Sequence, residues 1–126
     1  MHAAEWIDHW ITTFLSSSSG LLLALLILVL LDYITGVCLA VSEQKISSKI
    51  GTKGIAAKVL IVCLVALSYI VDTRILDSRE KFSSVTILFY CANEVISIFE
   101  NVNHFGLPLP RKFKECMAGL KSKKSA

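Results

Sequence analysis

Three acidic side chains lie in otherwise apolar surroundings, and any chemistry of this chain would start from them. Asp32 interrupts the apolar stretch 20–41, and Glu94 and Glu100 lie in a weaker apolar stretch, 83–104. Glu94 and Glu100 are six residues apart, which is about 9 Å along a helix. Two carboxylates at such a distance could act as acid and base on a sugar. A membrane helix offers no sugar cleft, so we expect no catalysis.

Other enzymatic and metal-binding patterns are missing from the sequence. It contains no G-x-S-x-G, H-E-x-x-H, C-x-x-C or G-x-G-x-x-G motif, the spacings typical of nucleophilic, zinc, thiol and dinucleotide sites. The four cysteines are far apart and mostly lie in apolar runs, where cysteine acts as a small hydrophobic residue. We therefore predict no metal, no cofactor and no nucleic-acid partner.

The composition indicates a membrane protein. Of the 126 residues, 54% are hydrophobic and 18% are charged, whereas a soluble domain has about 25% charged and 45–50% apolar residues. Because a small soluble fold cannot hide so much apolar surface, we expect an all-α integral membrane protein with one membrane domain.

Three stretches are long enough to cross a bilayer, which takes about 20 apolar residues in a helix. These spans lie at about 20–41, 55–71 and 83–104. They make up a membrane domain over residues 20–110, which a basic tail follows at 111–126. The amphipathic segment 1–19 either lies in the membrane interface or extends the first span.

Positive charge is concentrated in two segments. Residues 42–58 carry four lysines against one glutamate, and residues 111–126 carry six basic residues against one glutamate. The first nine residues have two acids and no Lys or Arg. Because Lys and Arg stay on the cytoplasmic side, three spans place the N-terminus outside and the tail in the cytoplasm. The basic side chains expected at the membrane surface are Lys45, Lys49, Lys53, Lys58, Arg111, Lys112, Lys114, Lys121, Lys123 and Lys124.

The third span carries a polar stripe, because its polar residues fall within a sector about 120° wide on a helix. The stripe consists of Thr86, Tyr90, Asn93, Glu94, Ser97, Glu100 and Asn101, and it continues to His104. These groups cannot face hydrocarbon cheaply, and the first two spans offer few polar partners beyond Asp32, Ser68 and Tyr69. We predict that the stripe faces an aqueous interior in an oligomer; the alternative is a three-helix packing that keeps it buried.

Asp32 lies deep in the first span and is expected to face protein, because an unpaired charge there costs about 2.5–3.5 kcal/mol on insertion scales. Gly36 and Ala40 follow at four-residue steps, so a second helix can approach closely. Lys58 is one candidate partner, although its long stem could instead carry the ammonium to the headgroups. The alternative is a protonated Asp32 held by a backbone or hydroxyl group.

Three motifs lie in a fixed order along the chain: LDYITGVCLA at 31–40, KISSKIGTKGIAAKV at 45–59 and YCANEVISIFENVNHFGLPLP at 90–110. Together they resemble the small holins of the phage-lysis and toxin-secretion family of Gram-positive bacteria and their phages, over about residues 21–120. The resemblance implies a protein that accumulates in the bacterial (host) cytoplasmic membrane and associates with copies of itself. Its lesions would let an endolysin, or a toxin without a signal peptide, leave the cell.

The residues alone also fit two other functions. The chain could be a small ion-conducting or transporter subunit, in which Asp32 and Glu94 bind a proton or a cation. It could also be a membrane anchor whose basic tail recruits a soluble partner. The resemblance favours the holin.

Overall fold

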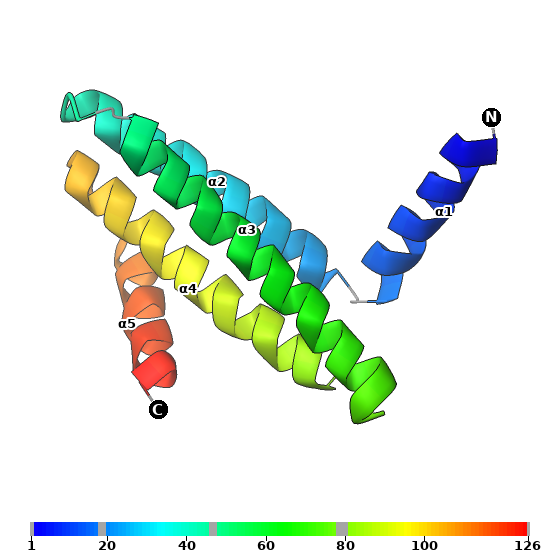
Figure 1. Cartoon of the computed structure of the whole chain (residues 1–126). Coiled ribbons are helices and arrows are strands. Elements are labelled where there is room, and N and C mark those ends of the chain that lie inside the picture. The colour runs from blue at the N-terminus through cyan, green and yellow to red at the C-terminus, as the bar shows by residue number, and fades with distance from the viewer. Residues whose placement is uncertain (1, 18–19, 46–47, 78–80, 126) are drawn as a thin grey trace.

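The computed structural model describes residues 2–17, 20–45, 48–77 and 81–125, and these residues are helical apart from short connections. The elements are α1 (His2–Ser17), α2 (Leu21–Ser42), α3 (Ser48–Ile70), the π-helical turn η1 (Val71–Ile75), α4 (Lys81–Phe105) and α5 (Arg111–Ser125). Figure 1 shows α2, α3 and α4 as neighbouring, roughly parallel rods, with α1 and α5 leaving opposite ends of this bundle.

Three helical stretches within the described residues are long and apolar enough to cross a membrane: Leu21–Ser42, Gly51–Ile75 and Lys81–Phe105. They confirm the all-α fold and the prediction of three helices long and apolar enough to span a membrane. The second stretch extends beyond the predicted 55–71 at both ends, because the helix begins before the apolar run and η1 continues it past Ile70.

The outer surface of the bundle is largely apolar. Leu30, Leu60 and Val85 are 58%, 62% and 66% exposed. The accessible surface is 9123 Å², against about 6,700 Å² for a compact soluble monomer of this mass. Lipid is the solvent in which such a surface is stable.

The interior is apolar at one end of the bundle. Leu22 and Leu25 of α2, Ile61 and Val65 of α3 and Ile87 of α4 form its buried cluster. Helix α4 packs along both α2 and α3, and its contact with α2 is the more extensive. α4 is therefore the helix around which the other two are arranged.

Two glycines mark the ends of the bundle. Gly20 has a φ of +82° just before α2, a left-handed conformation that glycine adopts without strain. Helix α1 ends at Ser17, so α1 and α2 are separate helices and not one extended span. Ser18 and Ser19, which lie between them, are outside the described residues. Gly106 (φ +101°) and the two prolines that follow end α4, because glycine adopts a left-handed conformation readily and proline does not continue a helix.

Asp72 of η1 holds the start of α4. Its carboxylate oxygens accept hydrogen bonds from the backbone N–H of Phe82 (3.0 Å) and of Ser83 (2.7 Å). The first N–H groups of a helix have no partner within the helix, and Asp72 supplies one from the preceding element. Asp72 is 1% exposed, so this buried cap joins η1 to the first turn of α4.

We expect Asp72→Ala to lower the free energy of unfolding by about 0.5–2 kcal/mol, the usual cost of losing a helix cap. Chemical unfolding in mixed micelles, followed by circular dichroism, measures this change. Thr73→Ala is the matched control, because the exposed Thr73 hydroxyl donates only one turn back, to the Tyr69 carbonyl of α3, and does not reach α4. Equal loss in the two variants would contradict the capping role of Asp72.

Candidate functional site

Lys58 of α3 joins two acidic residues from the other two helices of the bundle. Its Nζ donates to Glu94 Oε1 (2.9 Å) and Oε2 (2.7 Å) of α4. It also donates to Asp32 Oδ2 of α2. The three N–H groups of one ammonium are thus directed to three carboxylate oxygens, which ties α2, α3 and α4 together at one point.

The other oxygen of Asp32 is bound by α4. Asp32 Oδ1 accepts from Ser97 Oγ (2.7 Å) and from Asn101 Nδ2 (3.1 Å). Asn101 Nδ2 also lies 3.0 Å from Thr35 Oγ1. We call Asp32, Lys58 and Glu94, with Ser97 and Asn101, the charge cluster.

The charge cluster lies near mid-depth of the bundle. Asp32 is ten residues before the end of α2, Lys58 ten residues after the start of α3 and Glu94 eleven residues before the end of α4. These three helix ends lie at the same end of the bundle (Figure 1). A helix rises 1.5 Å per residue, so all three side chains start about 15 Å from that end, half of a bilayer core of about 30 Å.

The charge cluster is almost closed to its surroundings. Asp32 is 6% and Glu94 1% exposed, and the Lys58 side chain is 22% exposed. Among the described residues, every buried side-chain nitrogen and oxygen atom has a hydrogen-bond partner. Removing one partner of a buried ion pair destabilises a fold, because it leaves the other charge buried without a partner. The stability of the bundle therefore depends on all the charged side chains of the cluster being present together.

The structure divides the predicted stripe of α4. Glu94, Ser97 and Asn101 converge on Asp32 and Lys58. Thr86 donates to the Phe82 carbonyl of its own helix, Tyr90 packs beside the apolar cluster, and Asn93 is half-buried. Glu100 turns to another helix: its Oε1 lies 3.3 Å from Lys121 Nζ of α5.

The structure decides between the two expectations for Lys58. The prediction that its ammonium reaches the headgroups is wrong, because it points into the bundle toward Asp32 and Glu94. The pairing with Asp32 is confirmed. The sequence reasoning missed Lys58 as the partner of Glu94, although both residues lie at similar distances from helix ends that meet.

The close approach predicted at Gly36 is also present. A Cβ placed on Gly36 would lie 3.7 Å from Asn101 Nδ2, so α4 passes beside this glycine. Ala40, one turn later, is half-buried. The small side chains of α2 let Asn101 reach the Asp32 and Thr35 oxygens.

Most of the other predicted surface bases are exposed. Lys45 pairs with Glu43 (3.8 Å) and Arg111 with Glu115 (3.0 Å). The exposed remainder consists of Lys53, Lys112, Lys114 and Lys123. Lys49 and Lys124 lie in α3 and α5, but their side chains are outside what the structure describes. Within the described residues, no group of three or more His, Cys, Asp or Glu side chains could hold a metal ion.

A comparison of the sequence with known protein families identifies the family of this chain. The sequence profile of the bacteriophage holin family matches residues 9–122. The chain belongs to the bacteriophage holin family. Its charge cluster is therefore a feature of a holin-family membrane protein, and this membership indicates a protein without enzymatic activity.

Relatives of this holin-family chain occur in bacteria and phages. An uncharacterized protein of Halalkalibacterium halodurans is 38% identical over 109 residues, covering 83% of this chain and 81% of the relative. An uncharacterized 14.9 kDa protein of Clostridium perfringens is 35% identical, covering 82% and 78%. A protein of Bacillus phage phi105 named a probable holin is 35% identical over 86 residues, covering 68% and 63%. No solved structure shows a significant match to the chain.

Proposed function

We propose that this protein is a holin of the bacterial cytoplasmic membrane. Copies accumulate, associate and open lesions through which an endolysin, or a large toxin without a signal peptide, crosses. The observation that carries the proposal is the buried charge cluster in a chain of the holin family. In the closed bundle the polar side chains of the charge cluster pair with one another and are shielded from lipid. The same side chains are suited to line a water-filled opening.

The closed bundle and the lesion place the same residues in different surroundings. In the closed bundle Lys58 and Asp32 satisfy Glu94, Ser97 and Asn101. The charge cluster has two carboxylates for one ammonium, and this imbalance is unfavourable in a medium of low dielectric constant. Water solvates the carboxylates better, so association that admits water to this face of α4 relieves the imbalance.

Release of a folded protein tests the holin directly. The chain is expressed in a bacterial host together with an endolysin that has no signal peptide, and culture turbidity and external enzyme activity are followed. We expect abrupt lysis that requires both proteins.

The charge cluster also suits a small ion-conducting subunit, since intramembrane carboxylates mark ion pathways. Loss of membrane potential without escape of the enzyme would favour that function and overturn the holin.

We expect the N-terminus outside and α5 in the cytoplasm, because the basic segments flank the same end of the bundle. In a variant with alanine at Cys38, Cys63, Cys91 and Cys116, His9→Cys should react with an impermeant maleimide in intact cells. Lys123→Cys should react only after the membrane is permeabilised. Labelling before lysis begins measures this, and the reverse pattern would contradict the orientation.

A further inference from the structure

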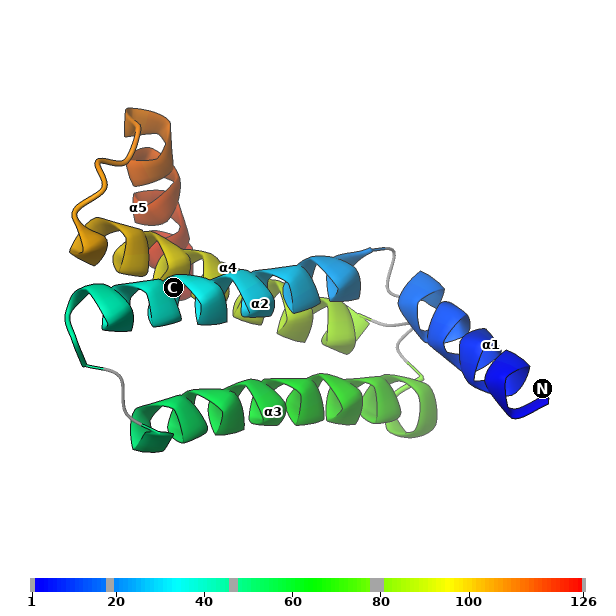
Figure 2. The ribbon, with the colours of Figure 1, turned by 90° about the horizontal axis from the view of Figure 1, so that it is seen from above.

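Helix α5 folds back onto α4 through two contacts. The ring of Phe113 packs edge-on against Phe99, with centroids 5.5 Å apart and planes at 73°. Lys121, eight residues further along α5, pairs with Glu100 at 3.3 Å. Residues about 12 Å apart along α5 thus meet adjacent residues of α4. Helix α5 therefore crosses α4 and does not run along it, as Figure 2 shows.

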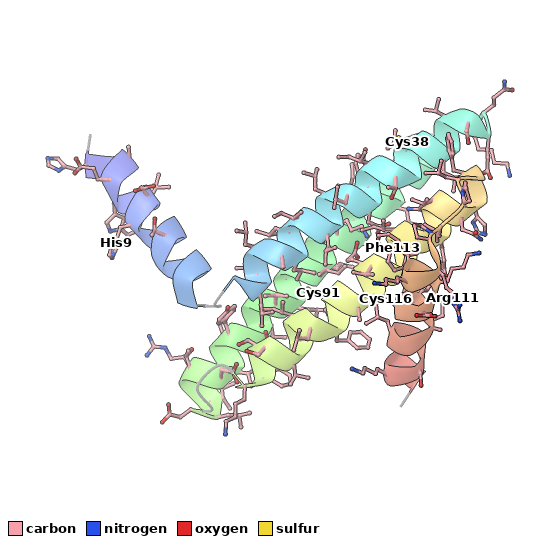
Figure 3. All side chains as sticks on the ribbon, turned by 180° about the vertical axis from the view of Figure 1, so that it is seen from behind. His9, Cys38, Cys91, Arg111, Phe113 and Cys116 are labelled. Carbon is pink, nitrogen blue, oxygen red and sulfur yellow. The ribbon has the colours of Figure 1, made fainter. Side chains whose placement is uncertain are left out.

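The side of α5 that meets α4 is its apolar side. Phe113, Met117 and Leu120 share one face at helical spacing, and Met117 and Leu120 are half-buried while their neighbours along the helix are exposed. Figure 3 shows Phe113 on the side of α5 that lies over α4, and Arg111 turned away from it. Helix α5 is thus amphipathic. Its apolar side, together with Lys121, contacts α4, and the remaining basic side chains described in α5 are exposed.

The connection before α5 is short and restricted. Gly106 turns the chain at a φ of +101°, and Pro108 and Pro110 each fix their own φ. The Pro110 carbonyl accepts the N–H of Phe113 (3.0 Å) and thereby starts α5. This connection keeps α5 beside the end of α4.

Helix α5 lies against the edge of the stripe that the bundle leaves open, where the Glu100 side chain stays 49% exposed. Glu94 and Glu100 are six residues apart, so they point about 120° apart around α4. Lys58 of the bundle neutralises Glu94, and Lys121 of α5 neutralises Glu100. Each glutamate of the stripe therefore has its own lysine, and the two lysines approach α4 from different sides.

We propose that α5 is an intramolecular clasp, formed by the Phe113–Phe99 and Lys121–Glu100 contacts, that must leave α4 before the lesion opens. This inference rests on the proposed holin function. A second copy can pack against the Glu100 edge of the stripe only after α5 has left it. Once α5 leaves, Glu100 has no ammonium beside it and requires water, which favours the open arrangement.

A cleavable cross-link tests the clasp. Glu100→Cys and Lys121→Cys are combined in the variant lacking the four native cysteines, joined with a short disulfide-containing bis-maleimide, and reconstituted in phosphatidylglycerol–phosphatidylethanolamine vesicles loaded with fluorescent dextran. We expect the joined protein to retain the dextran and to release it after the linker is reduced. The matched control joins Arg111→Cys to Glu115→Cys, which are paired within α5, and should release dextran in both states.

Charge reversal tests the same contact without a linker. We expect Lys121→Glu to speed release about two- to fivefold, the range that a half-exposed ion pair supports, and Glu100→Lys with Lys121→Glu to restore the original rate. If the protein joined between positions 100 and 121 releases dextran as fast as the joined control, the clasp is overturned and the holin function is not. If the unmodified protein and the control pair retain the dextran, the proposed holin function itself is overturned.

Discussion

Replacing Lys58 by methionine is expected to destabilise the bundle by about 3–5 kcal/mol, the cost of breaking a buried ion pair by removing one partner. Methionine fills similar space, but it leaves Asp32 and Glu94 facing each other with no cation between them. Two like charges this deep in a bundle repel strongly. Chemical unfolding in mixed micelles and the amount of protein in the membrane fraction should both report the loss.

Two further variants separate charge from packing at Lys58. Lys53→Met removes an exposed lysine of the same helix, and it should change stability by no more than about 0.5 kcal/mol. Combining Asp32→Asn, Lys58→Met and Glu94→Gln removes all three charges and should recover most of the loss. A triple variant as unstable as Lys58→Met would show that packing, and not charge, accounts for the effect.

Glu94→Leu is expected to reach the membrane at the normal level and yet fail to release endolysin. The remaining Asp32–Lys58 pair is neutral, so the closed bundle remains compatible with lipid. Leucine removes the group that most favours water on the stripe. Glu94→Gln keeps a hydrogen-bonding group and should still release endolysin at an altered time. The control is Glu43→Leu, which removes an exposed carboxylate at the end of α2 and should lyse normally.

Thiol reactivity shows whether water reaches the stripe. In the variant lacking native cysteines, Ser97→Cys and Asn101→Cys should be protected in the closed bundle and become reactive toward an aqueous maleimide at lysis. Val95→Cys and Leu88→Cys, which lie on other faces of α4, should stay protected by lipid. Equal reactivity of both pairs would contradict a water-lined stripe, and normal lysis by Glu94→Leu would remove the role of its charge.

The spans and the stripe were predictable because lipid imposes a local rule. Each residue of a spanning helix faces either hydrocarbon or protein, so hydropathy and helical periodicity together encode the lipid-facing side. The prediction for Asp32 followed from the same rule. The C-terminal end of α4 was predictable as well, since a glycine followed closely by two prolines is typical of the end of a helix.

The pairing of side chains between helices was harder to predict, because it depends on how three helices align. Lys58 and Glu94 are 36 residues apart, and no local pattern relates them. Position along the helices was the available signal, since both residues lie at similar distances from ends that meet. The partner of Glu100 depended on α5 folding back, and the charge of α5 alone suggested only contact with headgroups.

The central position of α4 has a consequence for how sharply the molecule can change state. Among the described helices, α4 packs against α2, α3 and α5, so the charge cluster and the clasp both include it. A shift of α4 that breaks one of these contacts weakens the other, since both depend on the placement of one rigid rod. Contacts that are lost together give a cooperative, all-or-none transition with few partly open intermediates. If the protein acts as the proposed holin, we therefore expect it to stay closed while copies accumulate and then to open within a narrow interval.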